Sequence, residues 1–237
     1  MFNDKKILAI IPARGGSKGL PNKNIKLLNG KPLIAWTIEQ AKSSKYIDDI
    51  FVTTDCNDIA AVSNQFGVEV PFLRPAELAS DTSSSMDVVE HVISHFKQQS
   101  VTFDYIVLLE PTSPLRKEND IDNAISMCVL DSSADGIISV GEVHMEHPMI
   151  VKKIDTDGKI TSYIDDVKKI TQRQQADKAY FPYGVIYMIK NEVFESKKIF
   201  YTNNIIPYYI ERWQNYEVDD IYDFIAIEAI LKKNEEL

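Results

Sequence analysis

A loop rich in glycine and basic residues follows the first apolar stretch of the sequence. Residues 12–24 read PARGGSKGLPNKN and contain three glycines, one serine and the cations Arg14, Lys18 and Lys23. Glycine lets the backbone come close to a ligand and turn its N–H groups toward it, which is how many loops hold phosphate groups. The loop therefore predicts a site for a phosphorylated ligand, with the three cations supplying positive charge.

Known loop motifs can be compared with this segment. The Walker A pattern G-x-x-x-x-G-K-[ST] and the dinucleotide pattern G-x-G-x-x-G are both absent. Residues 15–19 do fit G-x-S-x-G, the turn that carries the nucleophile of α/β-hydrolases. That turn must pass directly from a strand into a helix, whereas residues 20–24 read LPNKN and predict irregular chain. The hydrolase reading is therefore disfavoured.

Two carboxylates near the end of the sequence, Glu217 and Asp219, could bind a hard cation. Side chains two residues apart project to one side of an extended chain. Mg²⁺ takes oxygen ligands together with substrate phosphates, so the pair is a candidate magnesium site. The same residues precede the last expected helix, and the helix dipole alone would favour Asp219 and Asp220 at its start.

Polar residues also follow other expected strands. Asp55 ends the second strand, where it would either cap a helix or belong to a site. Arg74 and a run of serines ending at Ser85 precede a helix expected near Met86, and these hydroxyls could read a nucleobase edge or start the helix. Glu110 begins the proline-rich segment EPTSPLR, whose rigidity would make this carboxylate project from a strand end.

His144 and His147 lie three residues apart with Glu146 between them, a spacing loosely similar to that of zinc-binding sequences. A zinc site of the H-E-x-x-H type needs a helix, which Pro148 and the extended pattern around it oppose. A structural role for these histidines, in an interface or at the rim of a pocket, is the better interpretation.

The elements that must position these residues alternate between strand and helix patterns. Apolar runs predict strands at Ile7–Ile11, Asp49–Thr53, Val68–Phe72, Tyr105–Leu109, Gly136–Val140 and Val185–Ile189, with another near Ile205–Ile210. Helical periodicity is expected near 32–43, 57–66, 86–98 and 119–130, and from about Asp219 to Lys233. This rhythm predicts an α/β fold with a mainly parallel, Rossmann-like sheet, in which ligands bind at the carboxyl ends of the strands.

The regular alternation lapses at about 141–183, where short extended pieces are broken by prolines. Asp157-Gly158 predicts a hairpin between Met149–Ile154 and Lys159–Ile164. One domain over residues 1–237, with a strand-rich subdomain at about 141–183, is the expected organisation.

Composition excludes several classes of protein. The 237 residues include 26 basic and 35 acidic side chains, a formal charge of −9 that argues against a general nucleic-acid binder. Two distant cysteines, Cys56 and Cys128, suggest neither a disulfide framework nor a structural zinc site. The apolar stretch near the first residue is too short for a signal peptide core or a membrane span, so we expect a cytoplasmic protein without a membrane partner.

Taken together, these segments resemble the acylneuraminate cytidylyltransferases, also called CMP-sialic acid synthetases, over almost the whole chain. The loop IPARGGSKG followed by Lys23-Asn24 is similar to the opening signature of that family. In the family this loop holds the triphosphate of CTP, which implies phosphate roles for the following residues: Arg14, Gly15, Ser17, Lys18, Lys23 and Asn24. The segment at 74–85 is similar to the family's R-P-x-x-L-A-x-D-x-x-S-S stretch, which implies that Arg74 and Ser85 contact cytosine.

The resemblance also implies a sugar site and a metal site. Its sugar residues would be Glu110, Arg173, Gln174, Tyr183, Phe200 and Tyr201, with the aromatic pair facing the sugar across a homodimer. Glu110 stands where the family has Gln, Tyr183 where it has Asn, and Phe181 where some members have a second Arg. The acidic segment resembles the family's D-I-D-x-x-x-D metal motif, with Glu217 in the first Asp position and Asp219 in the second.

The implied reaction joins CMP from CTP to the anomeric hydroxyl of a nonulosonic, sialic-type sugar acid and releases pyrophosphate. Such transfer depends on positioning and charge neutralisation, so Arg14, Lys18 and Lys23 are the expected catalytic residues, with Mg²⁺ on Glu217 and Asp219. Arg173 would grip the sugar carboxylate through its guanidinium. The departures at the sugar end leave open a related enzyme that uses an eight-carbon sugar acid or GTP, or a relative that binds nucleotide sugars without turnover.

Overall fold

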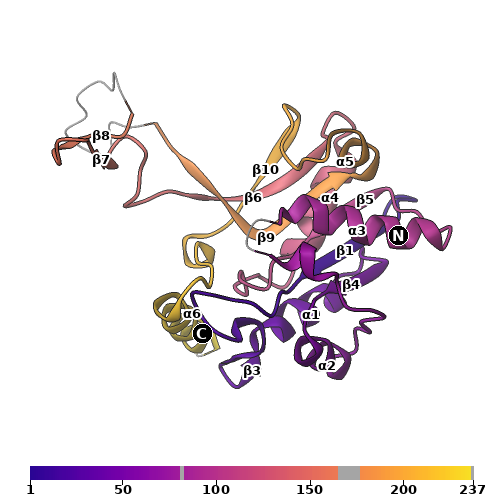
Figure 1. The fold of residues 1–237 in the computed structure, drawn as a ribbon. Helices are drawn as coiled ribbons and strands as arrows, with labels where there is room; N and C mark the ends of the chain where they lie inside the picture. The colour runs from indigo at the N-terminus through magenta and orange to yellow at the C-terminus, as the bar shows by residue number, and fades with distance from the viewer. Residues whose placement is uncertain (81–82, 165–176, 236–237) are drawn as a thin grey trace.

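The computed structural model describes residues 1–80, 83–164 and 177–235 and contains one six-stranded sheet and two short strand pairs (Figure 1). The strands of the main sheet are β1 (Ile7–Pro12), β4 (Asp49–Thr53), β5 (Tyr105–Leu108), β6 (Gly136–Glu142), β9 (Tyr180–Lys190) and β10 (Ile205–Tyr209). They lie in the order β10-β6-β9-β5-β1-β4, and β9 alone among them runs antiparallel to its neighbours. The expectation of a mainly parallel α/β sheet is confirmed.

Helices cover both faces of this sheet. The principal helices are α1 (Leu33–Ser43), α2 (Asn57–Gln65), α3 (Ser85–Gln98), α4 (Asp120–Leu130), α5 (Asn191–Lys197) and α6 (Ile221–Glu235). Side chains of α1, α2 and α4 pack into one core, and those of α3 and α5 pack into the core on the opposite face. Strand β1 is fully buried from Ile7 to Ile11 because neighbouring strands and both cores enclose it. The loop that follows β1 is therefore attached to the most rigid part of the fold.

A third core fixes the last helix beneath this loop. Leu20 from the loop packs with Val218 and with the buried face of α6, where Phe224 and Ile227 lie. Short elements complete this region: β2 (Leu27–Leu28), β3 (Lys31–Pro32) and the 3₁₀ turns Lys23–Ile25, Ala76–Ala79 and Arg212–Gln214. The loop after β1 and the last helix, far apart in the sequence, thus pack against each other.

The strand-rich segment projects from the body between β6 and β9, at the upper left in Figure 1. Its hairpin pairs β7 (Lys152–Ile154) with β8 (Ile160–Ser162), around a turn in which Gly158 has a φ of 76°. The expected hairpin therefore forms, with shorter strands than its apolar pattern predicted. Arg173 and Gln174 lie outside the described residues.

Two expectations about individual elements were wrong, and one helix was missed. Residues 68–72 form no strand: Pro71 lacks an N–H group, and the N–H groups of Val68 and Val70 bond to Ser63 O and Asn64 Oδ1 at the end of α2. Helix α5 was not predicted, because seven residues give too little periodicity. The segment that carries Glu217 and Asp219 is not a strand either, although the N–H of Val218 bonds to the backbone oxygen of Thr112.

Candidate active site

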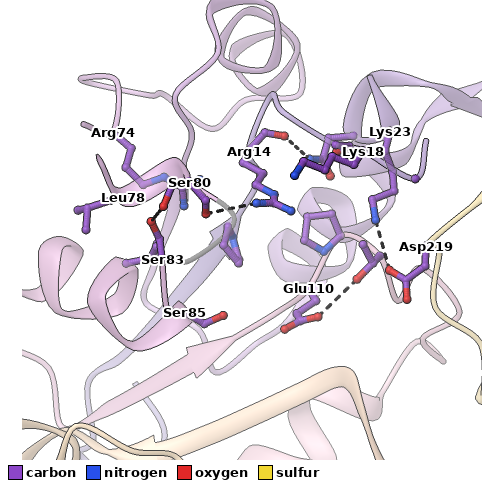
Figure 2. A pocket seen from close by; sticks show the side chains of 17 residues that line it. Arg14, Lys18, Lys23, Arg74, Leu78, Ser80, Ser83, Ser85, Glu110 and Asp219 are labelled. Carbon is purple, nitrogen blue, oxygen red and sulfur yellow. Dashed lines mark hydrogen bonds and ion pairs between the residues drawn. The ribbon is translucent and has the colours of Figure 1, made fainter. Parts of the chain in front are cut away.

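The carboxyl ends of β1 and β5 open into a cavity of about 560 Å³. Its walls come from the glycine-rich loop, the serine-rich segment, the strand end at Glu110 and the acidic segment before α6 (Figure 2). The predicted residues that line it are Arg14, Ser17, Lys18, Lys23, Asn24, Arg74, Ser85, Glu110 and Asp219. Segments more than 200 residues apart in the sequence therefore meet at one site. Gly15 lines an adjoining hollow of about 380 Å³ on the other side of the loop.

The loop is held in shape by hydrogen bonds to its own backbone and to its neighbours. Arg14 Nη1 donates to Ser80 O at 3.3 Å, and Asn24 Nδ2 donates to Arg14 O at 3.0 Å. The N–H of Gly15 donates to Asp55 Oδ1 at 2.9 Å. Beyond Gly19 the chain enters the 3₁₀ turn Lys23–Ile25 rather than a helix, so Ser17 does not occupy the strand-to-helix turn of a hydrolase.

The loop also touches the acidic segment directly. A Cβ atom on Gly19 would lie 2.4 Å from the backbone oxygen of Asp219, so this close approach requires glycine. Lys23 Nζ donates to Val218 O at 2.6 Å and lies 3.5 Å from Asp219 Oδ1. The Lys23 side chain is only 14% exposed, so it has little freedom to move, and its ammonium group points into the cavity (Figure 2).

Arg74 lies on the opposite wall, which is the wall expected to face the nucleobase. Its side chain is only 4% exposed, its guanidinium Nη2 lies 3.9 Å from Asp55 Oδ1, and its Nε has no hydrogen-bond partner among the residues that the structure describes. Burial lowers the pKa of Arg74, and the nearby carboxylate of Asp55 opposes that shift. A buried donor without a partner is costly, so this nitrogen is suited to an acceptor on a ligand.

The serine run divides between the helix and the cavity. Ser84 is the N-cap of α3, and its hydroxyl accepts from the N–H of Asp87 at 3.1 Å. Ser80, Ser83 and Ser85 line the cavity instead, with the first two hydroxyls 2.7 Å apart. Ser84 therefore starts the helix and the other serines line the cavity, where contact with a nucleobase stays a prediction.

Glu110 is the most perturbed carboxyl of the site. Burial and the nearby charge of Glu217 raise its pKa to about 7, against the opposing effect of the Arg116 guanidinium. Its side chain packs against Gly184, where an added Cβ would lie 2.6 Å from Glu110 Cβ. A side chain larger than hydrogen at Gly184 would displace this carboxyl.

The acidic residues before α6 have separate roles. Asp220 Oδ1 accepts from the N–H groups of Tyr222 and Asp223, and Asp223 Oδ2 accepts from the N–H groups of Asp219 and Asp220. These bonds cap the helix and account for Asp220 and Asp223 without a ligand. Asp219 is left with its carboxylate 85% exposed at the mouth of the cavity.

Glu217 points away from Asp219 into the body of the protein. Its Oε1 accepts from Ser113 Oγ at 2.8 Å and from the N–H of Gly184. In the described part of the chain, no three His, Cys, Asp or Glu side chains form a cluster suited to a metal. Glu110 and Asp219 nevertheless bring carboxylate oxygens to the cavity, and these suit Mg²⁺, which needs only one or two protein carboxylates beside substrate phosphates.

The described residues predicted to bind sugar are divided between two smaller cavities. Glu110 joins the main cavity to one of about 330 Å³ that Tyr187, Phe200 and Tyr201 also line. Phe200 is 2% exposed and packs on Phe194 as part of the core, whereas Tyr201 is 57% exposed. Tyr183 lines a different cavity, of about 380 Å³, with His144, Glu146 and Arg212.

The sequence did not single out two residues that organise the site, Arg116 and Tyr187, and it left Asp55 open between a helix cap and a site. Arg116 is buried and donates to the backbone oxygens of Glu110, Gly184 and Val185, which fixes the strand end beneath Glu110. Tyr187 lines the cavity beside Glu110, and Asp55 contacts the loop rather than capping α2. The sequence feature that could have identified Arg116 is its position at the end of EPTSPLR, after two prolines that fix the chain.

The histidine pair is not arranged as a zinc site. His147 is buried, its Nε2 lies 2.9 Å from Asp177 O, and its Nδ1 accepts from the N–H of Met149 at 3.3 Å. Both ring nitrogens are therefore engaged by the backbone, in agreement with a structural role. No helix of the described chain has the length and apolar character needed to cross a membrane.

A mostly parallel sheet with a basic, glycine-rich loop at its carboxyl edge defines a Rossmann-like nucleotidyltransferase fold. Solved structures of the same fold include CMP:2-keto-3-deoxy-manno-octonic acid synthetase complexed with CTP, with a TM-score of 0.72 and 17% identity over 97% of this chain and 99% of that one. A 4-diphosphocytidyl-2C-methyl-D-erythritol synthase has a TM-score of 0.70 at 12% identity, over 96% of this chain and all of that one.

Sequence comparison identifies the family. The family model described as cytidylyltransferase matches residues 8–237, and the chain belongs to this family. It is 34% identical to the CMP-N,N'-diacetyllegionaminic acid synthase of Legionella pneumophila, over 98% of both chains. It is 32% identical to the N-acylneuraminate cytidylyltransferase of Escherichia coli over 97% of its own length, but it spans only 53% of that longer protein. The pseudaminic acid cytidylyltransferase of Campylobacter jejuni is 29% identical over 98% of both chains.

Proposed function

We propose that this protein transfers CMP from CTP to the anomeric hydroxyl of a nonulosonic sugar acid and releases pyrophosphate. The observation that carries the proposal is the main cavity, in which three cations of the glycine-rich loop face a buried arginine and a serine-lined wall. Membership of the cytidylyltransferase family supports it, as do the names of relatives that match this chain along its full length.

In the reaction, the sugar hydroxyl oxygen forms a bond to the α-phosphorus of CTP while the bond from that phosphorus to the bridging oxygen of the β-phosphate breaks. Arg14, Lys18 and Lys23 are placed to bind the triphosphate and to neutralise the charge that develops on the leaving pyrophosphate. Loop N–H groups, together with Ser17 and Asn24, orient the phosphates, and Arg74 and Ser85 face the base. The hydrogen bonds of Lys23 and Arg14 to backbone oxygens hold these cations in place before substrate binds.

Mg²⁺ is the cofactor that fits this donor set. Asp219 would bind the ion at the cavity mouth. Glu217 would become a second ligand after releasing one of its hydrogen bonds, or would support the site through the residues that it contacts. When bound, the ion would neutralise phosphate charge and lower the pKa of a coordinated oxygen. Repulsion between Glu110 and Glu217 is consistent with a cation nearby, because a positive charge would relieve it.

The sugar acid would occupy the region beyond Glu110, toward Tyr201 on one side and Tyr183 on the other. Phe200, Arg173 and Gln174 remain predicted sugar residues by family resemblance. A carboxylate at residue 110 accepts hydrogen bonds from hydroxyl or amide N–H groups, which suits an acylamino sugar. A homodimer is part of the same proposal, and the protruding segment supports it because Ile154 and Ile160 are exposed by about three quarters. A cytoplasmic location is proposed with it.

The proposal is tested by pyrophosphate release from CTP or GTP with a panel of sialic, legionaminic, pseudaminic and octulosonic acids, each with added Mg²⁺. We expect release with CTP and at least one nine-carbon acid. Pyrophosphate release only with the eight-carbon acid, or only with GTP, would change the assigned substrates. No release with any combination of nucleotide and sugar acid would contradict enzymatic turnover.

A further inference from the structure

The carboxylate of Asp55, at the end of β4, contacts both walls of the main cavity. Its Oδ1 accepts the N–H of Gly15 at 2.9 Å, and the same oxygen lies 3.9 Å from Nη2 of Arg74. Gly15 belongs to the loop expected to hold phosphates, and Arg74 belongs to the wall expected to face the base. One oxygen atom therefore joins the two halves of the nucleotide site.

Local structure does not require this carboxylate. Helix α2 begins at Asn57, its N-cap is Cys56, and no side chain caps it. The N–H of Cys56 is satisfied by Thr54 Oγ1 at 3.1 Å. The hydrogen bond and the ion pair of Asp55 thus go to the cavity walls, which separates it from a helix-starting aspartate.

The charge of Asp55 matters because Arg74 is buried. A guanidinium taken out of water needs a compensating charge, and the cation of Arg14 opposes it from the loop. His91 on α3 also faces Arg74, and burial together with the charges of His95 and Arg74 lowers the pKa of His91. His91 therefore supplies no negative charge to Arg74, whereas the carboxylate of Asp55 offsets the effect of burial on this guanidinium.

We propose that Asp55 is a positioning residue with two separable actions: its hydrogen bond shapes the phosphate loop, and its negative charge orients Arg74 toward the nucleobase. The inference rests on the proposed function, because it takes CTP as the nucleotide. The N–H of Arg74 also donates to Thr54 O at 2.7 Å, so the backbone just after β4 and the side chain of Asp55 both hold the arginine.

Calorimetric binding of two probes separates these actions: CTP, which needs both walls, and inorganic tripolyphosphate, which needs only the loop. Asp55→Asn keeps an oxygen for the N–H of Gly15 but removes the charge facing Arg74. We expect CTP to bind about tenfold more weakly to this variant, with tripolyphosphate binding changed by less than about twofold. Asp55→Ala removes both actions and should weaken both probes.

Two further variants complete the design. Asp58→Asn removes an exposed carboxylate three residues away and should bind both probes like the unmodified chain. In an Arg74→Met background, Asp55→Asn should have almost no effect on CTP, because the group that it orients is gone. If Asp55→Ala does not fold, as judged by its thermal melting, Asp55→Asn still decides the question.

The role is overturned if Asp55→Asn binds CTP as tightly as the unmodified chain, or if it weakens CTP and tripolyphosphate equally. Failure of the proposed function has a different signature. In that case the unmodified chain binds CTP without releasing pyrophosphate for any sugar acid, while the contrast between the probes still upholds or overturns the role of Asp55.

Discussion

The nucleotide end and the sugar end of the site are built in different ways. At the nucleotide end, Arg14 and Lys23 donate to backbone oxygens, and the surrounding loops are fixed to β1 and α6. At the sugar end, Glu110 carries a raised pKa, and the aromatic residues divide between two cavities. A site whose cations are preorganised can neutralise phosphate charge without rearrangement. The sugar end is where differences in substrate are expected to arise.

The largest expected effect tests the nucleotide end. Lys23→Ala should lower kcat about a hundredfold to a thousandfold, because it removes a fixed ammonium group from the place where phosphate charge develops. Pyrophosphate release at saturating CTP and Mg²⁺ measures it. Lys26→Ala, which removes an exposed cation from the same segment, is the matched control. Activity of Lys23→Ala within threefold of the unmodified protein would contradict a preorganised phosphate site.

The next effect separates the two neighbouring aspartates. Asp219→Asn should lower kcat about a hundredfold and raise the Mg²⁺ concentration for half-maximal turnover, because an amide is a poorer magnesium ligand. Asp220→Asn is the matched control, since asparagine preserves the cap of α6. A Mg²⁺ titration of turnover measures both variants. Equal behaviour of the two variants would remove the metal assignment from Asp219.

A smaller effect is expected at Glu110, and it is measured as a change in the free energy of unfolding. Its ordinary pKa of 4.5 rises to about 7 in the folded protein. Below pH 4.5 the carboxyl of Glu110 is protonated in both the folded and the unfolded protein. Between pH 4.5 and about pH 7 it loses its proton only in the unfolded protein, so the free energy of unfolding falls as pH rises. Glu110→Gln removes this dependence and should gain about 3 kcal/mol relative to the unmodified protein between pH 4.5 and pH 8.

Chemical denaturation in EDTA at several pH values measures this difference. Glu118→Gln, which changes an exposed carboxylate nearby, should leave the pH profile as it is. If the stability of Glu110→Gln follows the same pH profile as the unmodified protein, the carboxyl of Glu110 is not held protonated by its surroundings.

The smallest expected effect distinguishes sugar binding from packing. Tyr201→Ala should raise KM for the sugar acid a few-fold and leave KM for CTP unchanged, with a change in stability of less than about 0.5 kcal/mol because the ring is exposed. Tyr222→Ala, which removes an exposed ring on α6, is the control. A rise in KM for CTP of the same size would place Tyr201 at the nucleotide end instead.

Contiguous parts of the site were predictable from the sequence, and parts that depend on tertiary packing were not. The loop at 12–24 carries its glycines and cations in one segment, and the structure gathers most of its predicted residues around one cavity. The bond from Gly15 to Asp55 joins residues 40 positions apart, and Glu217 reaches Ser113 and Gly184. Such contacts follow from how strands and loops are arranged, which no local pattern encodes.

The errors in the fold have the same origin. Residues 68–72 are apolar enough for a strand, yet their N–H groups are satisfied by the end of α2, so β4 remains at the edge of the sheet. Acidity before α6 also had two explanations that the sequence could not separate. The structure assigns Asp220 and Asp223 to the cap and leaves Asp219 at the cavity mouth.

The fate of the phosphates of CTP tests the central claim most directly. CTP labelled at the α-phosphate or at the γ-phosphate is incubated with Mg²⁺ and the sugar acid that gives turnover, and the products are separated. We predict that the α label appears in a CMP-sugar and the γ label in pyrophosphate. Release of the γ label as orthophosphate, with the α label left in CDP, would show hydrolysis of the nucleotide and contradict CMP transfer.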